Sequence, residues 1–138
     1  MVSRRQFLAA SAGLTLTGVP GRGADHRKRV AFLGTEIRQH SHAQHFLDRL
    51  TAGQAWGGYW LEPRVEVASI YIDQFPEGDL TPGRVERHGL DLYPSVADAL
   101  CLGGSELAVD GVVIIAEHGK YPRNEKGQTR YPRYDWFK

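Results

Sequence analysis

The sequence contains a single cysteine, Cys101, so no internal disulfide can form in any compartment. It also has no excess of one charge, with 17 Lys and Arg against 16 Asp and Glu. Without residues 1–23, 14 basic residues remain against 16 acidic ones, which argues against a nucleic-acid partner. With 41% hydrophobic and 24% charged residues, the 138-residue chain has the composition of one ordinary globular domain.

The first 23 residues have the pattern of a twin-arginine export signal. Arg4 and Arg5 stand in Ser-Arg-Arg-Gln-Phe-Leu, and uncharged, mostly small and apolar residues follow up to Pro20. This stretch falls short of the roughly 20 strongly apolar residues that cross a bilayer, so we expect no stable membrane span after signal removal. The alternative is an amphipathic first helix. We predict a signal over 1–23, export to the periplasm or another extracytoplasmic space, and a folded domain over 24–138.

Strand and helix patterns alternate along the folded domain. Short runs of apolar or β-branched residues predict strands. Apolar residues at helical spacing predict helices after Ser41 and after Ser95, and a turn followed later by Gly89 predicts a further short helix. The expected strands cover 29–34, 65–73, 90–93 and 110–116, and the expected helices start near 41, 79 and 95. Such alternation implies parallel strands joined by right-handed crossovers.

We therefore predict an α/β fold: a Rossmann-like parallel sheet of about four strands, in the order 3-2-1-4, with helices on both faces. Residues 119–138 form an irregular basic and aromatic tail in this prediction. The sheet would be incomplete at its C-terminal side, because no fifth strand follows.

Four segments carry a resemblance to a known family: Val30-Ala-Phe-Leu-Gly34, Ile70-Tyr-Ile-Asp73, the stretch from Arg87 to Leu100, and Asp110-Gly-Val-Val-Ile-Ile-Ala116. Over residues 29–120 their order and spacing resemble the N-terminal domain of the Gfo/Idh/MocA family of glucose-fructose oxidoreductases and inositol dehydrogenases. The resemblance implies NAD or NADP as cofactor and hydride transfer to or from a carbohydrate-like alcohol. The family's later Glu-Lys-Pro motif and substrate domain are absent, so the chain looks like a fragment without catalysis of its own.

Ligands of open parallel sheets bind beyond the carboxyl ends of the strands. That rule selects Gly34, Thr35 and Glu36 after the first strand, Asp73 after the second and Glu117 after the last as cofactor-binding candidates. The resemblance gives Asp73 the role of hydrogen-bonding the adenosine ribose. A turn acid before Pro76 is the alternative for Asp73.

The dinucleotide fingerprint itself is incomplete. Gly-x-Gly-x-x-Gly lets the backbone approach a pyrophosphate at a helix N-terminus, but this chain has only Gly34, with Glu36 and Gln39 at the other two glycine positions. A carboxylate at this place repels a pyrophosphate. The second hypothesis is therefore a non-redox exported domain of the same fold that binds a small polar ligand or a protein partner.

Histidines offer two further interpretations. His118, next to Glu117, is a candidate catalytic acid or base, although it could equally hydrogen-bond a loop. His42 and His45 could share a zinc ion with His40 or Glu36, but they flank the apolar helix face as solvent-side residues do, so we predict no metal site.

The tail from Lys120 to Lys138 has six basic and two acidic residues, interleaved with aromatic ones. It could bind a sugar phosphate or polyanion. The preferred interpretation is that aromatics at 131, 134 and 137 begin a helix that packs on more protein, either the remaining domain of a longer chain or another copy in a homo-oligomer.

Overall fold

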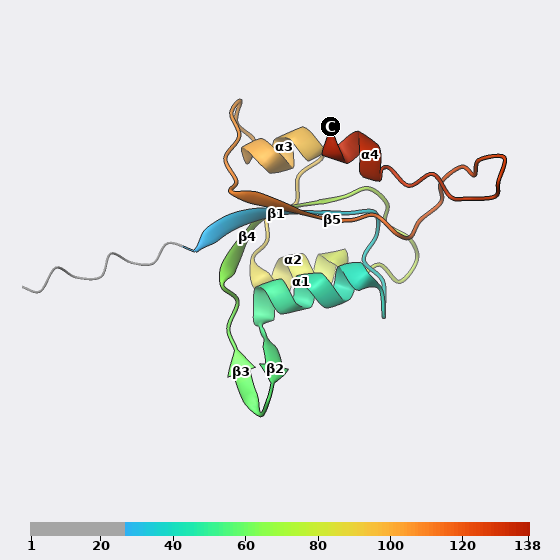
Figure 1. The fold of residues 1–138 in the computed structure, drawn as a ribbon. Coiled ribbons are helices and arrows are strands. Elements are labelled where there is room, and N and C mark those ends of the chain that lie inside the picture. The colour runs from blue at the N-terminus through green and yellow to red at the C-terminus, as the bar shows by residue number, and fades with distance from the viewer. Residues whose placement is uncertain (1–26) are drawn as a thin grey trace, which may run out of the picture.

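The structure is a computed structural model that describes residues 27–138 (Figure 1). The expected export signal lies outside the described residues. The elements, in chain order, are β1 (Lys28–Gly34), α1 (His42–Ala52), β2 (Gln54–Trp56), β3 (Tyr59–Leu61), β4 (Val65–Ile72), α2 (Thr81–His88), α3 (Val96–Cys101), β5 (Gly111–Ile115) and α4 (Arg133–Phe137).

The central sheet has three parallel strands in the order β4-β1-β5. The mixed α/β class and the parallel pairing predicted from the sequence are confirmed. The predicted count of four strands and the four-strand order are wrong, because segment 90–93 forms only an isolated bridge between Leu92 and Ile70. Pro94 follows at once, and a residue without an N–H cannot continue a ladder of hydrogen bonds.

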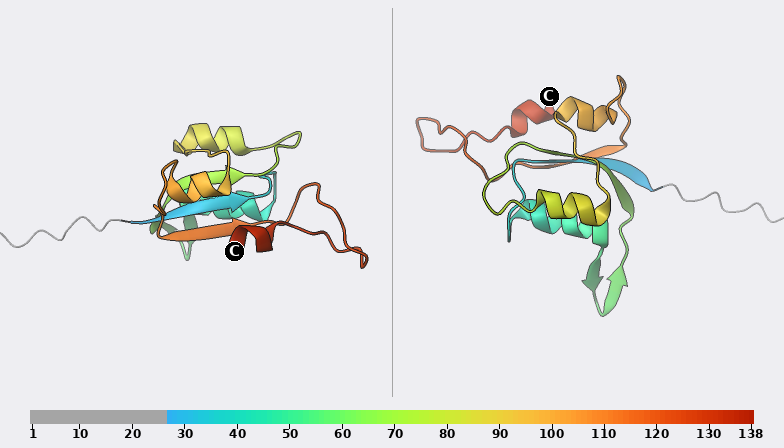
Figure 2. Two further views of the ribbon diagram at one scale, coloured as in Figure 1. Left: turned by 90° about the horizontal axis from the view of Figure 1, so that it is seen from above. Right: turned by 180° about the vertical axis from the view of Figure 1, so that it is seen from behind.

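Helices cover both faces of this sheet, with α1 and α2 on one side and α3 and α4 on the other (Figures 1 and 2). Consecutive residues of a strand point to opposite faces. Phe32 accordingly packs toward α1, Leu33 packs toward α3, and both side chains are fully buried. The second half of β1 is therefore buried on both faces.

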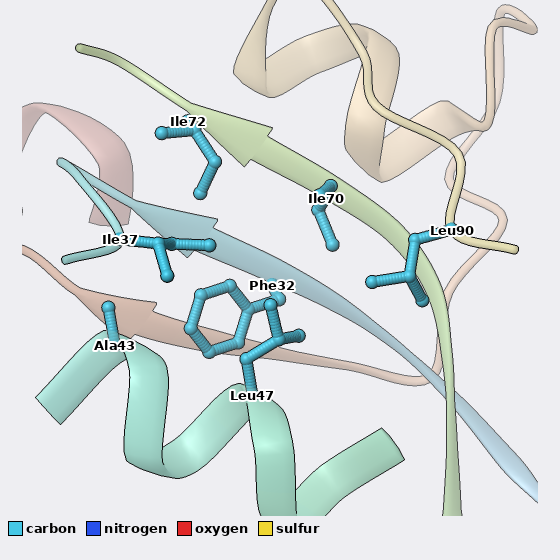
Figure 3. Packing of buried hydrophobic residues seen from close by; sticks show 7 residues of the cluster. All are labelled: Phe32, Ile37, Ala43, Leu47, Ile70, Ile72 and Leu90. Carbon is cyan, nitrogen blue, oxygen red and sulfur yellow. The ribbon is translucent and has the colours of Figure 1, made fainter. Parts of the chain in front are cut away.

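The larger core cluster lies between the sheet and α1 (Figure 3), and it consists of Phe32, Ile37, Ala43, Leu47, Ile70, Ile72 and Leu90. Ala43 and Leu47 of α1 are buried as the helical spacing predicts. Phe46, assigned by that spacing to the same face, is 44% exposed instead. It lies at the margin of the apolar stripe, next to the base of a hairpin that the sequence did not predict.

Side-chain caps start two of the helices. The Ser41 hydroxyl accepts a hydrogen bond from the Gln44 amide at 3.1 Å, and the Ser95 hydroxyl accepts one from the Asp98 amide at 3.1 Å. Both caps were predicted, since serine at this position satisfies an otherwise unpaired amide. Gly89 ends α2 in the left-handed conformation with φ 60°, also as expected.

A two-stranded antiparallel hairpin, β2 and β3, projects from the end of α1 (Figure 1). Gly57 and Gly58 join its strands with φ of 57° and 84°. Two successive positive φ values are what a tight hairpin turn requires, and Gly-Gly supplies them without steric cost. Sequence reasoning missed this element, although Gly-Gly between two aromatic-rich triplets was the available signal.

The C-terminal segment ends in α4, and contacts with the sheet hold it in place. Trp136 packs edge-on against Tyr71, with ring centroids 5.6 Å apart, and the Arg133 Nε donates a hydrogen bond to the Ala116 carbonyl at 2.7 Å. Tyr134 and Phe137 of the same helix remain largely exposed. Among residues 27–138, no helix has the length and apolar character to cross a membrane.

Candidate functional site

The carboxyl ends of the three strands meet through backbone hydrogen bonds. The Asp73 amide donates to the Gly34 carbonyl at 3.0 Å, and the Thr35 amide donates to the Ile115 carbonyl at 3.2 Å. The His118 amide also approaches the Thr35 hydroxyl oxygen at 3.4 Å. The structure thus brings together the loops that carry the predicted site residues.

Gly34 sits where a larger residue would collide with the core. A Cβ atom at this position would lie 2.9 Å from Ile72 Cδ1 and 3.3 Å from Phe32 Cε1. Contacts this short are closer than normal packing, so a larger residue here would force the Ile72 and Phe32 side chains to shift.

The loop after β1 contains an ion pair between two of its own residues. Glu36, at the second glycine position of the fingerprint, is 8% exposed, and its Oε1 lies 3.0 Å from Arg38 Nε. Thr35 and Ile37 on either side of it are also buried. A carboxylate and its guanidinium partner therefore occupy the stretch of loop that would have to face a pyrophosphate.

Arg38 also contacts His118, with 3.1 Å between Arg38 Nη2 and His118 Nδ1. A guanidinium group can only donate, so Nδ1 must accept and the proton of the neutral ring is on Nε2. His118 therefore offers an Nε2–H donor to an approaching ligand.

A second pair lies beside this one. His42, in the first turn of α1, contacts the Glu117 carboxylate through its Nδ1. Both side chains are partly exposed, so this pair contributes less than about 1 kcal/mol to stability. Its main effect is positional, because it fixes Glu117 against the start of α1.

Both carboxylate oxygens of Asp73 accept hydrogen bonds from tyrosine hydroxyls. The Tyr71 hydroxyl donates to Oδ1 at 2.7 Å, and the Tyr121 hydroxyl donates to Oδ2 at 2.5 Å. Burial, and next these hydrogen bonds to the carboxylate, raise the pKa of Tyr71 to about 12 and also raise the pKa of Tyr121. Each oxygen of Asp73 thus already accepts one hydrogen bond, and a ribose would have to share the carboxylate with the two hydroxyls.

Gln74 completes the attachment of the C-terminal segment. Its side chain accepts a hydrogen bond from the Lys120 amide at 2.9 Å and donates to the Lys120 carbonyl at 3.3 Å. Sequence reasoning did not select Arg38, Tyr71, Gln74 or Tyr121 as members of a site. The partners of Arg38, Gln74 and Tyr121 lie 46–80 residues away in the chain, and no local sequence pattern indicates such contacts.

The histidines at the start of α1 do not converge on one point with carboxylates. His40 has a left-handed backbone with φ 63°, and its ring lies 6.5 Å from that of His45. Within residues 27–138, no group of three or more His, Cys, Asp or Glu side chains is placed to hold a metal ion.

Comparison of the chain with known protein families, with curated proteins and with solved structures finds no match. The resemblance to the Gfo/Idh/MocA family therefore rests on the sequence pattern alone. The class that the fold defines is a mixed α/β domain with a three-stranded parallel sheet, which is fewer strands than predicted.

Proposed function

We propose that this chain is a non-redox, Rossmann-like ligand-binding domain that binds a small polar molecule at the carboxyl edge of its sheet. The observation that carries the proposal is the buried carboxylate of Glu36, which is paired with Arg38 at the second glycine position of the dinucleotide loop. The domain would act outside the cytoplasm, after export by the twin-arginine pathway.

Electrostatics disfavour a pyrophosphate at this loop. Two like charges about 4 Å apart repel by about 4 kcal/mol at the effective dielectric of a protein surface. Arg38 offsets the charge of Glu36, but a buried side chain stands at the position of the second glycine, whose role is to let the backbone approach phosphate oxygens. Both effects act against a dinucleotide, whose pyrophosphate must lie along this loop.

The carboxyl edge of the sheet presents both hydrogen-bond donors and hydrogen-bond acceptors. His118 supplies a donor through Nε2, Glu117 supplies carboxylate acceptors, and Arg38 has five N–H groups, of which its contacts with Glu36 and His118 use two. A ligand that carries both hydroxyl groups and an anionic or carbonyl oxygen matches this set. Small polyols and hydroxy acids have that chemistry.

A second candidate function is retained because of Asp73. It follows the second strand of the sheet, where the acid of a dinucleotide fold meets the adenosine ribose. In that case the chain would be the NAD- or NADP-binding part of a longer oxidoreductase acting on a carbohydrate-like alcohol, and the Tyr121 hydroxyl would leave Asp73 when the cofactor binds.

Titration of the purified chain with NADH and NADPH, followed by fluorescence, separates the two functions. We expect no saturable binding of either at about 1 mM. The double variant Glu36→Gly with Gln39→Gly restores the two missing glycines and should gain measurable binding. Arg38→Ala is the matched control, because it removes the ion pair but keeps the Glu36 carboxylate. This variant should not gain binding of NADH or NADPH. Saturable binding by the unaltered chain would instead establish the second candidate.

Titration with polyols and hydroxy acids tests the ligand-binding role directly. Nuclear magnetic resonance of the histidine side chains should show His118 shifting on ligand addition. The His118→Gln variant should bind more weakly, whereas His45→Gln, which alters an exposed histidine farther along α1, should bind as the unaltered chain does.

A further inference from the structure

The projecting hairpin carries three large aromatic side chains in the open. Trp56, Tyr59 and Trp60 are 73%, 76% and 58% exposed. None of them belongs to either core cluster, so they do not stabilise the domain by burial. Exposed aromatic groups concentrated on one short element mark a binding surface.

Two adjacent hollows flank Trp60 where the hairpin meets α1. Phe46, Leu61 and Arg64 line the first, and Trp56, Arg87 and His88 line the second. Trp60, Arg49 and Gln54 border both. The two hollows, which share these residues, together make up the track, with the Trp60 indole at their common border and polar side chains along its walls.

The track has an excess of positive charge. Arg49, Arg64 and Arg87 are exposed, and none of the three has an ion pair in the described part of the chain. Asp48, which also lines the track, is neutralised by Arg84 at 3.1 Å. Glu62 is the one acidic lining residue besides Asp48. The charge complements an anion that also has faces to stack on aromatic rings.

We propose that this track binds an acidic polysaccharide, a chain of sugar rings that carry carboxylate or sulfate groups. The indole of Trp60 stacks on the apolar face of one sugar ring, the arginines pair with the anionic groups, and Gln54 and Glu62 hydrogen-bond hydroxyls. The surface is separate from the carboxyl edge of the sheet. The two lie at opposite ends of α1, a helix of 11 residues and so about 16 Å long, and the proposal does not depend on the function of that edge.

Other occupants fit the track less well. A second copy docked by two-fold symmetry would bring the same unpaired arginines face to face, where like charges repel. A protein partner would need a contiguous patch of about 800 Å² per side, whereas the hairpin is only three residue pairs long.

Affinity electrophoresis of the full chain tests this proposal. We expect retardation in gels with sodium alginate, which carries carboxylates, or dextran sulfate, and none with neutral dextran. The polymer that retards the protein more strongly shows whether the site prefers carboxylate or sulfate groups. Retardation should weaken as salt is added, because part of the affinity is ionic.

Variants locate the site. Trp60→Ala and Trp56→Ala should each weaken binding about tenfold, the effect of losing one stacking contact. Arg64→Gln should also weaken binding. Arg130→Gln removes an exposed arginine of the C-terminal segment and is the matched charge control, so it should leave binding unchanged. Trp60 lies against Gly53, so melting curves must accompany its variant; the more exposed Trp56 gives an independent reading.

Three results would overturn the proposal. The first is that Arg64→Gln and Arg130→Gln weaken binding to the polysaccharide equally. The second is that oligo-deoxythymidine or poly-glutamate binds more tightly than either polysaccharide. The third is that no polymer retards the protein.

Discussion

Gly34 provides a test of whether the end of β1 is shaped by packing or by a ligand. A Cβ added there would meet Ile72 Cδ1 at 2.9 Å and Phe32 Cε1 at 3.3 Å. We predict that Gly34→Ala destabilises the domain and that Ile72→Val, which removes the Cδ1 atom, abolishes most of that loss.

The expected magnitude follows from the crowding. Overpacking by one methyl group costs about 1–3 kcal/mol, and the lower part of that range applies because Ile72 Cδ1 is the end of a flexible side chain. A loss of about 1–2 kcal/mol lowers the midpoint of thermal unfolding by about 4–8 °C in a domain of this size. Ile72→Val alone should cost about 1 kcal/mol, since it removes one buried methyl group.

Urea unfolding of the unaltered chain, the two single variants and the double variant forms a complete double-mutant cycle. We expect the double variant to be no less stable than Ile72→Val alone, which corresponds to a coupling of about 1 kcal/mol or more. Simple addition of the two losses would refute the packing explanation. So would an unchanged stability for Gly34→Ala, and the glycine would then have to be explained by a ligand.

Three further predictions concern the core and the tyrosine contacts. Leu47→Ala should cost about 3 kcal/mol in urea unfolding, because this side chain is fully buried beneath the sheet; a loss below about 1 kcal/mol would contradict the packing described. Burial, and next the hydrogen bond to Asp73, raise the pKa of Tyr71 to about 12 from an ordinary 10.0, so the contribution of the protonated Tyr71 to stability is complete below about pH 10 and is lost as the pH rises toward 12. Unfolding measured over pH 9–12 should show this loss, and Tyr71→Phe should reduce it. Tyr121→Phe should speed tryptic cleavage within residues 122–130 several-fold, because it removes the hydrogen bond between the C-terminal segment and Asp73; an unchanged rate would show that the other contacts of the segment, such as those of Gln74, hold it without Tyr121.

Local patterns in the sequence predicted the elements that local physics determines. The apolar runs at 29–34 and 110–116 are strands because both faces of the sheet are covered, and Ser41 and Ser95 start helices because each satisfies an orphan amide. Gly89 ends a helix because glycine readily adopts the left-handed conformation that terminates it.

The remaining features depend on contacts that no local pattern contains. Segment 90–93 has the composition of a strand, but it lies between Gly89 and Pro94 and is too short to extend the sheet. The roles of Arg38 and Tyr121 depend on His118 and Asp73, which lie 80 and 48 residues away. Glu36 was recognised as a departure from the glycine fingerprint, whereas its burial and pairing became visible only in three dimensions.

The two borders of the sheet differ in their capacity to accept another strand. Beyond β4, the Ile70 amide donates to the Asp91 carbonyl and the Ile70 carbonyl accepts from the Tyr93 amide, so that border is already blocked. Beyond β5, no strand follows within residues 27–138. Enlargement of the sheet, whether by more of the same polypeptide or by a foreign segment, therefore meets less obstruction at Gly111–Ile115 than beyond Ile70 of β4.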